Sequence, residues 1–268
     1  MIIFVCIFVA LVVLFLLLLR GRKDHPGLKD LQGWYYAHRG LHGQGRPENS
    51  MAAFRAALEG GYGIEFDLHL LKDGNLAVIH DSLLKRTTGA EGRIEDLTTE
   101  DLPNYQLEGT EETIPTFQQL LDLYAGKAPL IVELKPVGNN HAALCRTACD
   151  MLRSYSGPYC LESFDPRCIR WLKANRPELI RGQLAENSLK TYGDVPWIIR
   201  FALTYNLLNI WTQPDFIAYK FADRNTITNT CCRKIWKLLG VSWTIKRKED
   251  FDTAVKEGWL PIFEGFRP

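Results

Sequence analysis

Short apolar runs alternate along most of the chain with segments whose apolar side chains recur every third or fourth residue. The runs are typical of buried strands, and the recurring spacing is typical of helices packed on one face. The strands are predicted at 34–39, 63–70, 130–135, 159–164, 179–185, 215–221, 241–245 and 260–266. The helices between them are predicted at 49–61, 114–126, 141–154, 166–175, 196–209, 227–238 and 248–257. Repetition of one strand–helix unit favours an α/β fold of the TIM (β/α)8 barrel type. An open doubly wound sheet is the alternative, but the glycine-rich dinucleotide turn is missing.

One stretch, "HLLKDGNLAVIHD" at 69–81, breaks this alternation. Its Asp73-Gly74 pair is a two-residue hairpin signal. Pairing outward from that turn sets Asp67 opposite His80, so we expect the second strand to pass the barrel rim and return His80 to it. His69 continues the strand face of residues 65 and 67, which would place it near the site, but we expect it at a solvent-facing position of the hairpin.

The N-terminus differs from the rest, because residues 2–19, "IIFVCIFVALVVLFLLLL", are uniformly apolar. A run of this length nearly crosses a hydrocarbon core of ~30 Å, which predicts a single membrane anchor over 1–23. A cleaved signal peptide is the alternative, but no small-residue cleavage site follows. Arg20, Arg22 and Lys23 follow the run, so the positive-inside tendency predicts a membrane protein with its catalytic domain in the cytoplasm.

Composition limits the number of domains and the class of partner that we expect for the rest of the chain. The 268 residues carry a formal net charge of +1 and 46% apolar residues, which suits one large domain and gives no signal for nucleic acid. We predict a linker over 24–33 and a barrel domain over 34–268.

Charged and titratable residues gather where the predicted strands end. His38 and Arg39 end the first strand, and Glu65 and Asp67 share one face of the second. Glu133 and Lys135 follow the same pattern near the end of the third barrel strand. Active sites of β/α barrels lie at the carboxyl ends of the strands, and three carboxylates suit a hard divalent cation better than zinc.

An ordered series of motifs carries a family resemblance over about residues 34–245. The motifs are "AHRG", "PENS", "EFD", "DGNLAVIHD", "RTTGAEG", "IPTFQQLL", "VELK", "SFD" and "WTI". In this order they resemble the glycerophosphodiester phosphodiesterase family. The resemblance implies a TIM barrel with a small insertion at about 82–113. It also implies a metal-dependent enzyme that cleaves glycerophosphodiesters to sn-glycerol 3-phosphate and an alcohol.

The matching motifs assign roles to particular residues. His38 and His80 take the places of the catalytic histidines. Glu65, Asp67 and Glu133 take those of the ligands to one divalent cation, Mg²⁺ or Ca²⁺. Positions that bind the phosphate or organise the site are taken by Arg39, Glu48 and Lys135. Trp243, at a predicted strand end, either packs against the substrate or fills the core.

One difference from the family and two alternative functions stay open. The family usually ends on a segment containing an aspartate, whereas this chain ends "GWLPIFEGFRP", where Glu264 or nothing replaces it. A membrane lysophospholipid is an alternative substrate, which would make the protein a lysophospholipase D. A catalytically inactive lipid-binding protein is the third reading, although all five proposed catalytic and metal-ligand residues are present.

Overall fold

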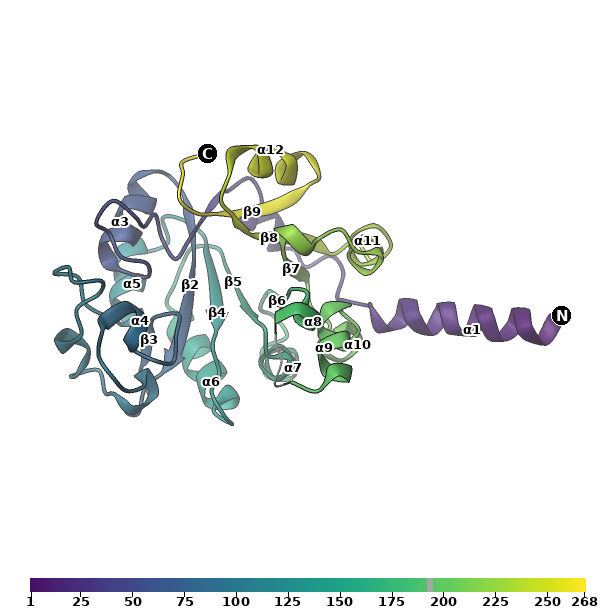
Figure 1. The fold of residues 1–268 in the computed structure, drawn as a ribbon, viewed down its shortest axis with the longest axis horizontal. Coiled ribbons are helices and arrows are strands. Elements are labelled where there is room, and N and C mark those ends of the chain that lie inside the picture. Colours follow the sequence, from purple (N-terminus) through teal and green to yellow (C-terminus); the bar gives the residue numbers. More distant parts are fainter. Residues whose placement is uncertain (192–194) are drawn as a thin grey trace.

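The computed structural model describes residues 1–191 and 195–268, and its centre is a closed barrel (Figure 1). Eight parallel strands form it: β1 (Tyr36–His38), β2 (Gly63–Leu70), β4 (Leu130–Leu134), β5 (Tyr159–Ser163), β6 (Arg181–Ala185), β7 (Phe216–Lys220), β8 (Leu239–Ile245) and β9 (Trp259–Phe263). The barrel closes because β1 pairs with both β2 and β9. The predicted TIM-type barrel is therefore confirmed.

Helices cover the outside of the barrel. The longer ones are α3 (Met51–Glu59), α5 (Phe117–Tyr124), α6 (His141–Leu152), α7 (Pro166–Asn175), α9 (Trp197–Thr204), α11 (Ile227–Lys234) and α12 (Lys248–Lys256); shorter ones are α2 (Leu28–Leu31), α8 (Ser188–Thr191) and α10 (Asn209–Thr212). Polar caps set several starts, as at α3, where Ser50 Oγ accepts from Ala53 N at 3.1 Å. The preceding residue, Asn49, directs its side-chain amide to Asp67 on β2.

The hairpin that follows β2 has a register one residue away from the predicted one. In the ladder between β2 and β3 (Leu76–Val78), Leu68 pairs with Val78 and Leu70 with Leu76. The loop has three residues, because Leu71 N bonds Asn75 O at 2.8 Å and Gly74 takes a positive φ of 86°. Asp67 therefore faces position 79, and His80 lies one residue beyond it.

Residues 82–113 form a small layer beside β2. It contains α4 (Lys85–Thr88) and the 3₁₀ turns η1 (Ile94–Asp96) and η2 (Leu102–Asn104). Its apolar side chains, among them Leu84, Ile94, Leu102 and Leu107, form a cluster separate from the main core, which Ile79 and Ile114 also join. This layer supports the hairpin that carries His80.

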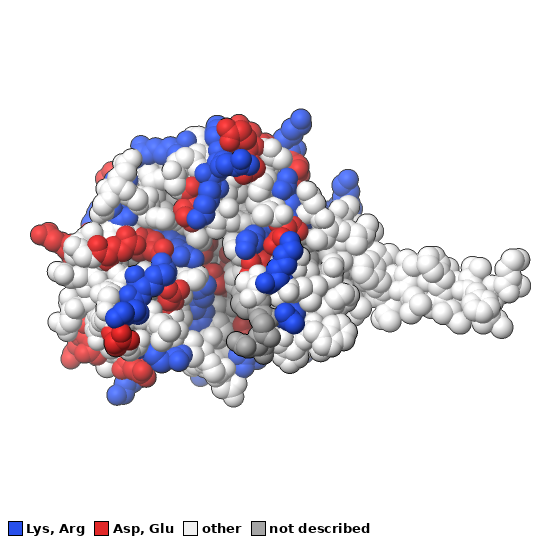
Figure 2. Space-filling model, in the orientation of Figure 1, with Lys and Arg blue, Asp and Glu red and all other residues white. Residues whose placement is uncertain are grey.

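The N-terminal apolar run folds as α1 (Ile2–Leu18), an uncharged stem that projects from the barrel (Figures 1 and 2). The helix has 17 residues, which at 1.5 Å each is about 25 Å, shorter than a hydrocarbon core of ~30 Å. Its last turn packs on the barrel: Leu19 is buried, and Trp236 Nε1 donates to Leu16 O at 2.8 Å. Among the described residues, no helix is both long and apolar enough to cross a membrane. The prediction of a single-pass membrane protein with a cytoplasmic catalytic domain, and of the membrane as partner, is corrected by this finding.

The segment after α1 is tied to the amino-terminal end of the barrel by a partly buried ion pair. Arg22 Nη2 lies 2.6 Å from Asp215 Oδ2 and 2.8 Å from Leu179 O. Asp215 is fully buried and also accepts from Arg181 N at 2.9 Å. The pair joins the N-terminal segment to β6 and the start of β7.

Replacing Arg22 by methionine should lower the free energy of unfolding by about 3 kcal/mol, because it leaves the Asp215 carboxylate buried without its cation. Urea unfolding followed by circular dichroism measures this loss. Lys29→Met is the matched control, since Lys29 is exposed on α2. Equal unfolding midpoints for the two variants would contradict the assigned role of the pair.

Candidate active site

The barrel register brings the predicted polar residues to the same level. His38 pairs with Glu65 across β1 and β2, and Asp67 pairs with Glu133 across β2 and β4. Glu133 in turn pairs with Glu162 on β5. Since residues two apart on a strand share a face, these side chains line one interior layer at the carboxyl end of the barrel.

The carboxylates of Glu65, Asp67 and Glu133 form one cluster. One oxygen from each lies within 4.8 Å of the others, and all three residues are buried. Lys135 Nζ bridges two of them, at 3.2 Å from Asp67 Oδ1 and 2.9 Å from Glu133 Oε1. Arg39 Nε lies 3.3 Å from Asp67 Oδ2.

The three carboxyls of this cluster have very different pKa values. Burial opposes ionisation of Asp67, but Lys135, His80 and Arg39 hold its pKa well below the ordinary value. Burial, reinforced by the neighbouring carboxylates, raises the pKa of Glu65 well above its ordinary value and that of Glu133 to about 7. A raised pKa favours the protonated carboxyl, so Asp67 is the most readily ionised member of the cluster.

A divalent cation fits this donor set. The ligand atoms are all carboxylate oxygens, which hard cations such as Mg²⁺ and Ca²⁺ prefer. Glu162 adds a fourth buried carboxyl beside Glu133, and neither of its oxygens has a hydrogen-bond partner in the described structure. When all four carboxyls are ionised, their charge exceeds that of Arg39 and Lys135 by two, which a divalent cation would balance.

His38 is held by a carboxylate on the side away from this cluster. Its Nδ1 lies 2.7 Å from Glu264 Oε2, at the end of β9, while its Nε2 lies 3.8 Å from Glu65 Oε2. Burial opposes ionisation of Glu264, but hydrogen bonds from His38 and Lys246 hold its pKa well below the ordinary value. An ionised carboxylate only accepts, so Nδ1 carries the proton and Nε2 presents a lone pair to the site.

His80 is held in the same way on the opposite side. Its Nδ1 lies 2.5 Å from Asp81 Oδ1, and its backbone oxygen lies 3.1 Å from His69 Nε2. The expectation that His69 faces solvent is wrong: this residue is buried, and its Nδ1 bonds Glu95 Oε1 at 2.7 Å. The insertion thus positions the hairpin end through His69.

Glu48 organises the basic groups around the cluster. Its Oε1 accepts from Arg39 Nη1 at 2.9 Å and from Arg86 Nη2 at 2.6 Å. Arg86 also bonds Asp81, which links Glu48 to the carboxylate behind His80. Arg39 adopts a left-handed φ of 53°, and Gly40 follows at 80°. A Cβ at Gly40 would lie 2.9 Å from the Ala53 carbonyl carbon, so this turn requires glycine.

Two cavities with shared lining residues lie beside these groups. A cavity of about 650 Å³ is lined by residues of the insertion and of the β4 and β5 ends, among them His80, Arg86 and Lys135. An inner cavity of about 40 Å³ shares His80 and Glu133 with it and also touches His38 and Trp243. The Trp243 ring stands edge-on to Phe164, at 5.4 Å between centroids, and its Nε1 donates to Ala218 O. Trp243 therefore forms a wall of the inner cavity.

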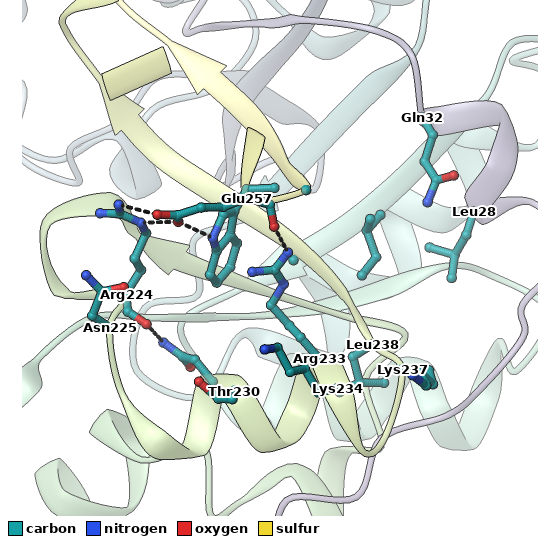
Figure 3. A pocket seen from close by; sticks show the side chains of 15 residues that line it. Leu28, Gln32, Arg224, Asn225, Thr230, Arg233, Lys234, Lys237, Leu238 and Glu257 are labelled. Carbon is teal, nitrogen blue, oxygen red and sulfur yellow. Dashed lines mark hydrogen bonds and ion pairs between the residues drawn. The ribbon is translucent and has the colours of Figure 1, made fainter. Parts of the chain in front are cut away.

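Another cavity, of about 550 Å³, lies near the starts of β8 and β9, away from these groups (Figure 3). Its arginines are already bonded: Arg224 Nε lies 2.8 Å from a Glu257 carboxylate oxygen, and Arg233 Nη2 donates to Glu257 O at 2.7 Å. The described residues that line it include neither a histidine nor a group of carboxylates.

Four residues near the cluster were not predicted to act there. Asn49 Nδ2 donates to Asp67 Oδ2 at 2.9 Å, and Arg86 Nη2 donates to Glu48 Oε1. Asp81 and Glu162 are the others. The "PEN" and "HD" motifs contain two of them, whereas Glu162 was detectable only as a carboxylate inside an apolar strand.

The chain matches a known protein family. The profile of the "Glycerophosphoryl diester phosphodiesterase family" matches residues 38–212, more than half of the chain. A glycerophosphodiester phosphodiesterase of Caldanaerobacter subterraneus is 29% identical over 232 residues, covering 83% of this chain and 89% of that protein. A human lysophospholipase D is 32% identical over 135 residues, which are 46% of this chain and 41% of that protein.

Solved structures share the fold. An Oleispira antarctica phosphodiesterase, determined in complex with the product sn-glycerol-3-phosphate, matches with a TM-score of 0.74 and 22% identity, covering 91% of this chain and 95% of that one. A protein described as a putative glycerophosphoryl diester phosphodiesterase of Silicibacter pomeroyi matches with a TM-score of 0.74 and 20% identity, covering 90% of this chain and 94% of that one.

Proposed function

Because this chain belongs to the glycerophosphoryl diester phosphodiesterase family and is an enzyme of that kind, we propose that it hydrolyses glycerophosphodiesters to sn-glycerol 3-phosphate and an alcohol with the help of a divalent cation. One observation carries the proposal. His38 and His80 each have a carboxylate on Nδ1 and both line one cavity beside three clustered carboxylates. The product bound to the Oleispira antarctica phosphodiesterase supports the same substrate class.

The two histidines exchange protons with the substrate. One accepts a proton from the attacking oxygen, and the other supplies a proton to the leaving alkoxide. Both roles need an imidazole whose protonation changes near neutral pH and whose ring is fixed in one orientation. Glu264 orients His38 and Asp81 orients His80, each through Nδ1, so that Nε2 is the reacting atom.

The cations of the chain bind the phosphate. Arg39 is held by Glu48, and Lys135 is held between Asp67 and Glu133. Their charges face the cavity and offset the negative charge that builds on the phosphoryl oxygens during displacement. Glu65, Asp67 and Glu133 would hold Mg²⁺ or Ca²⁺, which stabilises that charge further when bound.

A lysophospholipid is the second candidate substrate. Relatives named lysophospholipase D match part of this chain, and Leu83, with 60% of its surface exposed, lines the larger cavity. An acyl chain attached to the glycerol would extend along such an apolar edge. The same histidines and carboxylates would perform the chemistry.

A substrate panel tests both candidates. The purified protein with Mg²⁺ or Ca²⁺ is given glycerophosphocholine, glycerophosphoethanolamine and lysophosphatidylcholine, and phosphate-containing products are identified by mass spectrometry. We expect sn-glycerol 3-phosphate from the first two. A kcat/KM at least tenfold higher for lysophosphatidylcholine would favour the second candidate. Failure of the folded protein to cleave any of them would contradict the proposed function.

A further inference from the structure

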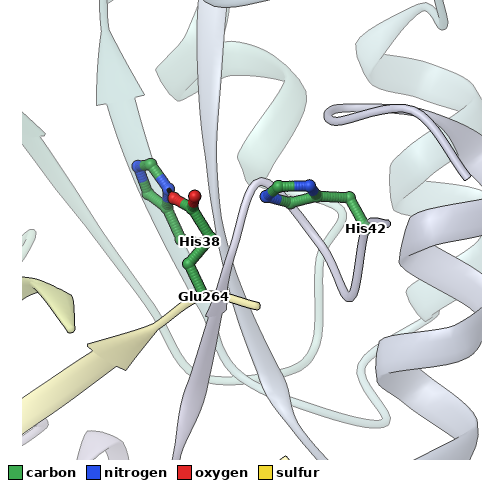
Figure 4. Close-up of side chains that lie close together, drawn as sticks. All are labelled: His38, His42 and Glu264. Carbon is green, nitrogen blue, oxygen red and sulfur yellow. Dashed lines mark hydrogen bonds and ion pairs between the residues drawn. The ribbon is translucent and has the colours of Figure 1, made fainter. Parts of the chain in front are cut away.

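A second group of metal-binding side chains lies directly behind His38 (Figure 4). Ring nitrogens of His38 and His42 and a carboxylate oxygen of Glu264 lie within 4.8 Å of one another. This group shares His38 with the proposed catalytic site, but its other members take no part in the carboxylate cluster. His42 lies in the loop that follows β1.

Each of the three side chains is held by defined backbone. His38 ends β1, and the neighbouring pair Ala37–Phe263 in the β1–β9 ladder brings Glu264 beside it. Glu264 N donates to Ile245 O at 2.9 Å. Around His42, Leu41 N donates to Ala53 O at 3.0 Å, and Gly43 N donates to Arg46 O at 2.8 Å. The donor atoms are therefore brought together by the fold.

One donor in this group lacks a partner. His42 Nε2 is buried and has no hydrogen-bond partner in the described structure. A buried polar atom without a partner is costly unless something binds it. In Figure 4 the ring of His42 is directed toward Glu264 and His38. The orphaned nitrogen thus points to a ligand held between the three side chains.

We propose that His38, His42 and Glu264 form an inhibitory zinc site, distinct from the carboxylate cluster and resting on the proposed function only for its effect on catalysis. Two imidazoles and one carboxylate are a common ligand set for Zn²⁺, with a fourth position left for water. Imidazole nitrogen favours zinc, whereas the all-oxygen cluster favours Mg²⁺ or Ca²⁺. The two sites therefore prefer different ions because their ligand atoms differ.

Binding of the ion requires the donor atoms, which lie within 4.8 Å of one another, to rearrange. Tetrahedral bonds of 2.0–2.1 Å set donor atoms about 3.3 Å apart. The His38 Nδ1 to Glu264 Oε2 distance is 2.7 Å, so this hydrogen bond must open by about 0.6 Å, within side-chain rotation. Lys246 Nζ bonds the other oxygen, Oε1, at 2.8 Å and can stay there.

Zinc at this position changes the proton on His38. In the metal-free ring, Nδ1 carries the proton, which it donates to Glu264, and Nε2 has the lone pair. Binding of Zn²⁺ to Nδ1 moves the single ring proton to Nε2, because a neutral imidazole has one N–H. No proton is gained or lost overall, but Nε2 can no longer accept one. If His38 acted as the acid, it would have to give up this Nε2 proton, which would leave the ring as an imidazolate anion. Either catalytic role of His38 is therefore blocked.

Zinc binding in excess Mg²⁺ tests this inference directly. The full chain carries Cys6→Ser, because Cys6 is an exposed thiol that would itself bind zinc. Isothermal titration with ZnCl2 should show one site, and His42→Gln should weaken it about 100-fold, since loss even of an outer-shell partner costs 10–100-fold. His25→Gln is the control. The inhibition constant for zinc, normalised to the zinc-free rate of each variant, should rise in parallel.

Each result decides the question. Absence of zinc binding, or equal binding by His42→Gln and the control, overturns the site whether or not the protein hydrolyses any phosphodiester. Binding that needs His42 but leaves turnover unchanged overturns the inhibitory effect. Co²⁺ added to the Cys6→Ser protein should give the visible absorption of a four-coordinate ion. This measurement keeps the test decisive if His42→Gln fails to fold, and a spectrum of a six-coordinate ion would also overturn the site.

Discussion

Exhaustive removal of divalent cations should lower turnover of glycerophosphocholine by about 10³-fold or more. A Lewis-acid cation contributes several kcal/mol of transition-state charge stabilisation, and each 1.36 kcal/mol is a factor of ten in rate. Without the cation, only Arg39 and Lys135, which are already paired with carboxylates, offset the charge that builds on the phosphoryl oxygens. The measurement is kcat after dialysis against a chelator, followed by addition of Mg²⁺ or Ca²⁺, which should restore the rate.

Site-directed variants separate this effect from a general effect of chelation. Glu65→Gln should bind Mg²⁺ more weakly in isothermal titration and should lose activity in the same proportion. Glu91→Gln, which changes an exposed carboxylate in the insertion, should bind and turn over like the native protein. Full activity after exhaustive chelation, or recovery with Zn²⁺ alone, would count against the proposed cation site.

Replacing either His38 or His80 by alanine should lower kcat/KM by about 10²-fold or more, which is the usual contribution of general acid–base catalysis. Both variants should stay folded. The β1–β2 pairing does not depend on the His38 ring, and the hairpin end is held by the backbone oxygen of His80. The measurement is steady-state kinetics with glycerophosphocholine, together with circular dichroism.

His25→Ala is the matched control, because His25 lies before the barrel and bonds Glu178 O at the other end of the fold. Its kinetics should match those of the native protein. Near-native turnover by folded His38→Ala or His80→Ala would show that the corresponding imidazole is not the group that exchanges protons with the substrate.

The order of strands and helices could be predicted from the sequence because periodicity is a local property. The strand at 63–70 and the helix at 166–175 were predicted with the bounds that the structure has. Glu65 and Asp67 could be assigned to one face for the same reason, since their spacing of two is set by the strand itself. The hairpin was harder: a three-residue loop at Gly74, where two were expected, moved the register by one.

The partners of the site residues depended on chain segments far apart in sequence. Glu264 lies 226 positions from His38, and its role as orienting carboxylate follows from the closure of β9 onto β1. The burial of His69 follows from the insertion, which supplies Glu95. Arg86 comes from the same insertion and reaches Glu48 across the mouth of the barrel.

The sequence by itself determined the repeating strand–helix pattern, the family motifs and the residue types that gather at strand ends, because each depends on neighbours a few positions away. Only the tertiary structure decided that the run at 2–19 forms a helix of 17 residues whose end packs on the barrel. It also decided that His42 and Glu264 lie beside His38. Hydropathy records how apolar a segment is, but packing across the barrel determines which atoms it contacts.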